Sequence, residues 1–328
     1  MRDREKRVKF CLKKSNAAVQ RNGPKAGAGR KGTGEAMEEK KRIKIALGEF
    51  GTGSGSQETF EKISDRMARE AARAGAKILC LPELSACGYF IRREELLKAA
   101  LTAEKQGEKM ARTAKKYGIS LIFGYPERDG ETIYNSCLAV GADGSCIQNI
   151  RKVNLWKSEK KRFSEGRDFP VFKTCAGRTA AVLCYDLEFP EPARIVSMNG
   201  ARLIFCPAAW SFAAERRWEV DLASAALCNL AFTAGANYRD ENCCGGSCVY
   251  GPDGRQRSPE KEIPIELSGA GESRLLIFEL DLDETEKERG KVPYYEDWKG
   301  ELYGNLMKEA WEKRKQSGSL FSSGLSPS

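Results

Sequence analysis

Three reactive side chains of different chemical types each stand at the end of a short apolar run. Glu83 lies in LPELSACGY, Lys152 in RKVNLW and Cys184 in LCYDLEFPE. Apolar runs of this length are typical of buried strands, and strand ends present side chains to the clefts of layered α/β proteins. A carboxylate, an amine and a thiol that met there would supply a general base, a cation and a nucleophile.

The chain contains no histidine among its 328 residues. This excludes Ser-His-Asp and Cys-His hydrolases, histidine-bound zinc enzymes and iron sites with two histidine ligands. The tightest cysteine cluster, Cys243, Cys244 and Cys248, offers three thiols and no C-x-x-C pair, so we expect no metal. Any acid–base chemistry must come from carboxylates, lysines, tyrosines or thiols.

The apolar residues alternate between strand-like runs and helical segments. Strands are predicted over 43–49, 77–83, 120–127, 132–140, 146–153, 178–186, 201–209, 232–237, 247–255 and 274–282. Helices are predicted over 57–76, 104–117, 190–199 and 213–229. This alternation, interrupted by a hairpin at Asp143-Gly144, predicts a layered α/β domain with a mixed sheet.

Motifs that bind nucleotide cofactors are missing from the sequence. No G-x-G-x-x-G follows a predicted strand, and no G-x-x-x-x-G-K-[ST] occurs. We therefore expect no cofactor. The 12 cysteines are dispersed through a long chain, which predicts reduced core residues rather than a disulfide framework.

Positive charge is concentrated at the start of the chain. Residues 1–42 carry 14 Lys and Arg against 5 Asp and Glu, whereas the remaining residues are balanced. The Gly- and Lys-rich run 23–34 cannot bury a core, so we expect a disordered tail, with Met37 as an alternative start. No signal peptide and no run of about 18 apolar residues is present, which predicts a cytoplasmic protein that binds no membrane.

Three motifs in this order, PEL-x-x-x-GY, RK-x-x-L and CYD-x-x-FPE, resemble the nitrilase superfamily of carbon-nitrogen hydrolases, in its amidase and carbamoylase branch. Further segments that resemble the family are EKKRFSEG (159–166), CPAAW (206–210), GGSCVYGPDG (245–254) and VPYYEDWKGELYG (292–304). The resemblance covers a domain over residues 43–304 and leaves 305–328 as a C-terminal tail. It implies a four-layer α-β-β-α sandwich that forms a homodimer or a higher homo-oligomer.

The resemblance also implies a role for each motif residue. Glu83 would be the base, Cys184 the nucleophile that forms a thioester acyl-enzyme, and Lys152 the cation beside the developing oxyanion. Glu159 would hydrogen-bond to Lys152 or orient it without exchanging protons, and the backbone N–H of Tyr185 would donate a hydrogen bond to the oxyanion. The implied reaction hydrolyses an amide or an N-carbamoyl amine with release of ammonia.

The chain departs from the family pattern around the nucleophile. Asn154 replaces a histidine two residues after the lysine, and Glu188 replaces a common arginine. Tyr-Asp after the nucleophile favours amides over nitriles. Asp186, Glu188 and Glu191 form an acidic turn, which predicts that substrates bearing a carboxylate are disfavoured.

Two alternatives remain open at this point. The first is a nitrile hydrolase of the same superfamily. The second is a nucleic-acid or surface-binding protein that acts through the basic tail and carries a silent domain. The Glu-Lys-Cys set favours the enzyme, and a nucleic-acid partner is not expected.

Overall fold

The computed structural model describes residues 42–54, 56–266 and 272–316. The basic tail up to residue 41, including the alternative start Met37, lies outside these residues. The chain divides into two units, the first ending at Glu288 and the second beginning at Arg289.

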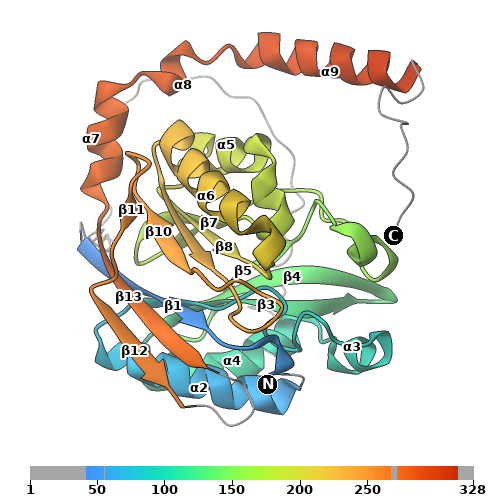
Figure 1. Cartoon of the computed structure of the whole chain (residues 1–328), viewed down its shortest axis with the longest axis vertical. Coiled ribbons are helices and arrows are strands. Elements are labelled where there is room, and N and C mark those ends of the chain that lie inside the picture. Colours follow the sequence, from blue (N-terminus) through green and yellow to red (C-terminus); the bar gives the residue numbers. More distant parts are fainter. Residues whose placement is uncertain (1–41, 55, 267–271, 317–328) are drawn as a thin grey trace, which may run out of the picture. The chain divides into compact units, whose positions relative to one another are not determined.

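Two β-sheets form the centre of the first unit (Figure 1). In the described residues one sheet has the strand order β12-β13-β1-β2-β3-β4-β5, and the other β11-β10-β9-β8-β7-β6. The strands of the first sheet are β1 (Arg42–Glu49), β2 (Ile78–Cys80), β3 (Ser120–Asp129), β4 (Thr132–Val140), β5 (Cys146–Arg151), β12 (Lys261–Ile265) and β13 (Ser273–Asp281). Those of the second are β6 (Val171–Thr174), β7 (Gly177–Ala181), β8 (Leu203–Pro207), β9 (Phe232–Ala236), β10 (Cys248–Tyr250) and β11 (Gln256–Arg257).

Each sheet is mixed, as the sequence predicted. Strands β1, β2 and β3 run parallel, as do β7, β8 and β9, while the outer pairs are antiparallel. The parallel strands of each sheet therefore end at the same edge, and the loops that follow them meet there.

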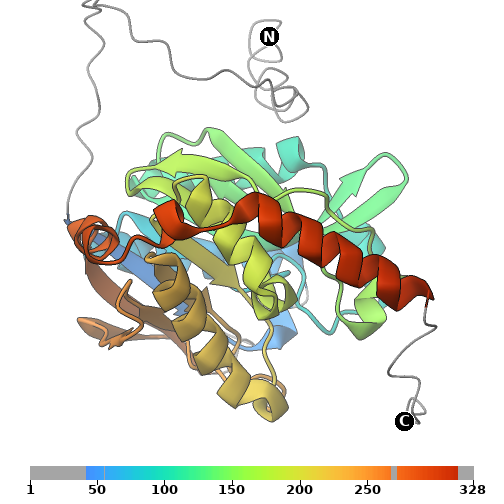
Figure 2. The ribbon, with the colours of Figure 1, turned by 90° about the horizontal axis from the view of Figure 1, so that it is seen from above.

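Helices cover the outer face of each sheet. The helices of the first unit are α2 (Gln57–Arg73), α3 (Arg93–Ala99), α4 (Ala103–Tyr117), α5 (Pro190–Met198) and α6 (Glu215–Asn229). Helix α7 (Asp283–Lys291) begins in the first unit and ends in the second. Short 3₁₀ turns are η2 (Thr52–Ser54), η3 (Lys157–Lys161), η4 (Cys184–Glu188) and η5 (Phe212–Ala214). Helices α2 and α4 pack on the first sheet, and α5 and α6 pack on the second (Figure 1). The yellow-green helix α5 and the yellow helix α6 lie in front of the sheets in Figure 2. A separate apolar core that includes Leu47, Cys80, Phe205 and Phe232 fills the space between the sheets.

The helices begin and end where local chemistry dictates. The Ser56 hydroxyl accepts the Thr59 N–H at the start of α2, and Thr102 caps α4 by the same contact to Lys105. Helix α4 ends at Gly118, whose φ of 62° is the left-handed conformation that glycine adopts freely. With helix, sheet, sheet and helix stacked in order, the predicted four-layer α-β-β-α sandwich is confirmed.

The second unit contains α8 (Tyr294–Asp297) and α9 (Gly300–Gln316). The segment expected to be a tail is therefore helical as far as Gln316. Among the described helices none combines the length and apolar character needed to cross a bilayer.

Gly124 on β3 allows an unusually close approach of the loop that follows β2. Its N–H donates to Pro82 O at 3.1 Å, and its carbonyl accepts the Ala86 N–H at 3.1 Å. A Cβ at this position would lie 2.1 Å from the Leu84 nitrogen and 2.7 Å from the Glu83 Cα. Only a residue without a side chain fits, so Gly124 fixes where Glu83 lies.

We expect Gly124→Ala to lower the free energy of unfolding by about 1–3 kcal/mol, because backbone on both sides resists the added methyl group. Denaturant unfolding measures this change. Gly290→Ala in α7 is the control, since its Cβ would meet no atom within 4 Å and should leave stability unchanged or slightly raised. Wild-type stability of Gly124→Ala would contradict the close approach.

Candidate active site

The three predicted catalytic residues meet in the described structure. Glu83 lies in the loop after β2, Lys152 directly follows β5, and Cys184 begins η4 shortly after β7. All three are buried, with Glu83 and Lys152 fully shielded from solvent and Cys184 7% exposed. The first two come from one sheet and the third from the other, so the site lies where the two sheets end together.

The Lys152 ammonium lies between two carboxylates. Its Nζ donates to Glu83 Oε1 at 2.6 Å and to Glu159 Oε1 at 2.9 Å. Burial alone would lower the pKa of Lys152, but the charges of Glu83, Cys184 and Glu159 outweigh burial and raise it. Lys152 therefore stays cationic at neutral pH.

Burial has the opposite consequence for the base and the nucleophile. It raises the pKa of Glu83, although Lys152 partly offsets this increase. It also raises the pKa of the Cys184 thiol well above its usual range, with a further increase from Glu83 and a decrease from Lys152. The thiol is thus protonated at neutral pH, and the ionised form of Glu83 is a stronger base than an exposed carboxylate.

The backbone is strained at both reactive groups. Cys184 has a φ of 45°, and Leu84, which follows Glu83, has a φ of 49°. Non-glycine residues adopt this left-handed region at a cost, and such residues cluster at functional sites.

Glu159, for which the resemblance implies a supporting role, lies against the Lys152 ammonium and is held by two donors. Its Oε1 accepts the Tyr89 hydroxyl at 2.8 Å, and its Oε2 accepts the Trp156 N–H at 2.8 Å. It is 1% exposed. These donors hold the carboxylate against the ammonium.

Tyr185 lies among aromatic rings beside the nucleophile. Its ring centroid is 4.8 Å from that of Trp156 and 5.2 Å from that of Phe189. Tyr185 is half-buried and Trp156 is 37% exposed, so the aromatic cluster reaches the surface. It gives the site an apolar border.

Two of the three carboxylates in the acidic turn after Cys184, those of Asp186 and Glu188, have partners, whereas Glu191 is exposed at the start of α5. Asp186 is 1% exposed and accepts the backbone N–H groups of Val153 and Asn154 and the side-chain Nδ2 of Asn154. Glu188 forms an ion pair with Arg217 on α6. Asn154, which stands where the family has histidine, instead joins the lysine loop to the nucleophile turn.

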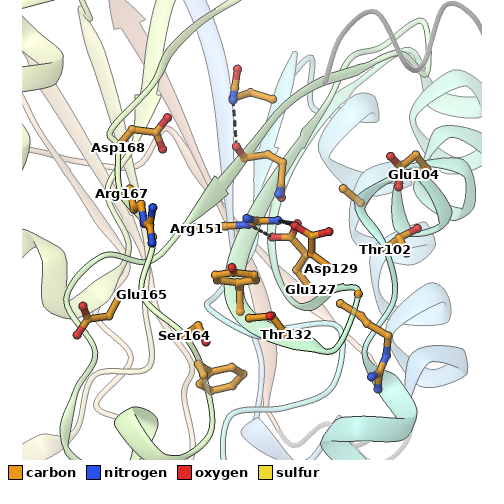
Figure 3. A pocket seen from close by; sticks show the side chains of 18 of the residues that line it. Thr102, Glu104, Glu127, Asp129, Thr132, Arg151, Ser164, Glu165, Arg167 and Asp168 are labelled. Atoms are coloured by element: carbon orange, nitrogen blue, oxygen red, sulfur yellow. Dashed lines mark hydrogen bonds and ion pairs between the residues drawn. The ribbon is translucent and has the colours of Figure 1, made fainter. Parts of the chain in front are cut away.

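A pocket of about 1160 Å³ lies beside the site but does not include the catalytic residues (Figure 3). Arg151 projects into it and pairs with Glu127 and Asp129 at 2.6 and 2.8 Å. The adjacent Lys152 projects into the catalytic site, since successive side chains along a strand point to opposite faces.

Sequence reasoning missed two polar residues of this site and misjudged one. Asn135 and Tyr89 contact the carboxylates, and Asp186 is a buried acceptor. Asn135 could have been noticed as an amide inside the apolar strand TIYNSCLAV, because buried polar groups need partners.

Asp186 should make stability depend on pH. Burial raises its pKa from 3.8 to about 6, so the folded state holds this proton more tightly than the unfolded chain. The free energy of unfolding should therefore fall as pH rises from about 3 to about 7, by roughly 3 kcal/mol from this residue. Asp186→Asn should flatten this fall in urea titrations, whereas Asp168→Asn, at an exposed position, should not. An unchanged slope in Asp186→Asn would refute the assignment.

The chain is similar to known proteins of one family. The carbon-nitrogen hydrolase family profile matches residues 51–287. The protein named "Hydrolase in pqqF 5'region" from Pseudomonas protegens is 34% identical over 244 residues, covering 71% of this chain and 81% of that protein. The omega-amidase NIT2 of Homo sapiens is 30% identical over 258 residues, covering 74% and 90%.

A solved structure has the same fold. It is a cysteine-to-alanine mutant of an amidase from Nesterenkonia AN1, of the nitrilase superfamily, with a TM-score of 0.67 and 25% identity. The alignment covers 80% of this chain and 97% of that one. Together with the family match, this likeness shows that the chain belongs to the carbon-nitrogen hydrolase family, within the nitrilase superfamily.

Proposed function

We propose that the protein hydrolyses a small amide or N-carbamoyl amine through a thioester on Cys184. The observation that carries this proposal is the buried Lys152 ammonium between Glu83 and Glu159, beside a buried thiol. A structural core would gain little from two carboxylates and an ammonium, since their desolvation is expensive. A nucleophilic site needs such charges in fixed places.

The first half of the reaction forms the acyl-enzyme. Glu83 takes the thiol proton as the Cys184 sulfur attacks the carbonyl carbon, and negative charge develops on the carbonyl oxygen. The Lys152 ammonium and the Tyr185 N–H stabilise this charge. Glu83 then returns the proton to the leaving nitrogen, so that ammonia leaves and a thioester remains.

The second half regenerates the enzyme. Water enters, Glu83 takes one of its protons, and the oxygen attacks the thioester carbon. The thiolate leaves, recovers the proton from Glu83, and the acid product dissociates. Lys152 stays charged throughout, because its pKa is raised.

The contacts made by the turn after the nucleophile widen the range of candidate substrates. Asp186 and Glu188 have partners, so the physical reason for excluding substrates with a carboxylate no longer holds for them. A relative that is 30% identical is named an omega-amidase. We therefore include ω-amides of dicarboxylic acids with neutral amides and N-carbamoyl amines as candidates, and ammonia release from each class would rank them.

The proposed roles predict the kinetics of three variants. Cys184→Ala should abolish turnover while the fold is kept. Glu83→Gln and Lys152→Ala should each lower kcat by at least about 10²-fold, the scale for losing a positioned base or an oxyanion partner. Ammonia release from the amide panel measures the loss.

The covalent intermediate gives an independent check on the nucleophile. Mass spectrometry of a quenched reaction should find the acyl adduct on the peptide that contains Cys184. Cys228 provides the comparison, since it is an exposed thiol that should carry none. An adduct on a cysteine other than Cys184 would show that the nucleophile is misassigned.

We also propose that two copies associate through the face formed by α5 and α6. Ile195 and Met198 on α5 are each 42% exposed, and Val220 and Leu227 on α6 are 44% and 46% exposed. The two helices pack beside each other, so these side chains add to one apolar surface. A second copy would remove that surface from water.

Charge on this surface should prevent the association. Ile195→Glu combined with Val220→Glu should convert a dimer or larger assembly to monomers, as measured by light scattering. Leu97→Glu on α3 is the control, because Leu97 is also exposed but lies on another helix. If the wild-type protein is itself a monomer, the proposed interface is wrong.

A further inference from the structure

Asn135 occupies the centre of the charged network. It lies on β4 and is fully buried. Its carbonyl accepts the Lys152 N–H at 2.8 Å, which fixes the lysine main chain. Its side-chain Nδ2 donates to Glu83 Oε1 at 2.8 Å and lies 3.4 Å from Glu159 Oε1. One residue therefore contacts the base, the cation and the supporting carboxylate.

The two oxygens of Glu83 have different surroundings. Oε1 accepts both the Lys152 ammonium and the Asn135 amide. Oε2 is buried and accepts no bond from a nitrogen or oxygen donor among the described residues. An oxygen that accepts two strong bonds is less basic, so a proton taken from the nucleophile goes to Oε2.

The side-chain oxygen of Asn135 lies in an unfavourable environment. Its Oδ1 is buried and has no hydrogen-bond partner within the described part of the chain. A buried polar atom without a partner costs stability, and an apolar residue of similar size would avoid that cost. The hydrogen bonds that the amide nitrogen donates must therefore be the reason that an asparagine stands at this position.

We propose that Asn135 is a positioning residue that holds Glu83 Oε1 and thereby leaves Oε2 as the oxygen that carries the proton. The inference rests on the proposed function and deepens it. The Cys184 S–H bond breaks, its proton forms an O–H bond at Oε2, and the sulfur electron pair forms the bond to carbon. The same O–H later gives its proton to the leaving nitrogen. Lys152 alone leaves the carboxyl free to rotate about its contact, whereas a second donor fixes its plane.

Removal of the amide donor should change the pH dependence of the nucleophile. Asn135→Leu keeps the approximate volume but loses the donor to the charged form of Glu83, so the pKa of that carboxyl rises. The acid limb of Cys184 alkylation by iodoacetamide, followed by mass spectrometry of its peptide, should move up by about one pH unit. With an amide substrate, kcat should fall about 10- to 100-fold while KM changes little, as for a misplaced reacting group.

Ser136→Ala is the matched control on the same strand. Ser136 is buried and donates to Glu127 Oε2 at 2.7 Å, a carboxylate outside the catalytic network. Its loss should lower the melting temperature without moving the acid limb. Asn135→Ala, which only removes atoms, serves if Asn135→Leu fails to fold, and should show the same shift.

The outcomes separate this inference from the proposed function. An unmoved acid limb in a folded Asn135 variant overturns the positioning role, whatever happens to the melting temperature. An equal shift in Ser136→Ala overturns it too. If the limb moves in Asn135→Leu alone, the role is supported, even when the wild-type protein releases no ammonia from the amide panel. That last result would overturn only the proposed function.

Discussion

A fully buried ammonium group is the constraint around which the site is built. Lys152 has no contact with solvent, and two carboxylates at 2.6 and 2.9 Å replace the water that it has lost. Either carboxylate alone would leave the other side of the ammonium exposed to apolar surroundings, at considerable cost. The strands and loops that hold Glu83 and Glu159 must therefore stay in register with β5, and this requirement ties chemistry to fold.

The sandwich meets this requirement by joining the loops to one another rather than only to their own strands. Gly124 on β3 holds the loop of Glu83, and Asp186 joins the loop of Lys152 to the turn of Cys184. These contacts fix residues with left-handed backbone at Leu84 and Cys184. Strained residues persist only where the surrounding structure determines their positions, as it does here.

Much of this arrangement could be predicted from the sequence, for identifiable reasons. The strand at 132–140 matches β4, because its ends are marked by turn residues and its centre by β-formers. Glu83, Lys152 and Cys184 were singled out because each stands at the end of an apolar run, and Glu159 because its segment resembles the family. Short or polar elements such as β6 and β12 were missed, since a few half-exposed residues carry no clear period.

Contacts between segments that are distant in the chain could not be predicted from the sequence. Both faces of β4 are buried, so alternation cannot tell which face Asn135 joins. The acidic turn looked like free charge because Arg217 is 29 residues away from Glu188 in sequence. The sequence shows only which charged residues are neighbours along the chain. The electrostatic field in a cleft also depends on the ion pairs that folding forms between distant residues.

The protonated resting thiol has a consequence for the chemical durability of the enzyme. Peroxides oxidise the thiolate form of cysteine, and thiols with a raised pKa in buried surroundings are inert to them. Because burial and the Glu83 charge raise the pKa of Cys184, we expect its sulfur to react slowly with peroxides until a substrate carbonyl arrives. The nucleophile would then stay reduced between turnovers because the thiol remains protonated.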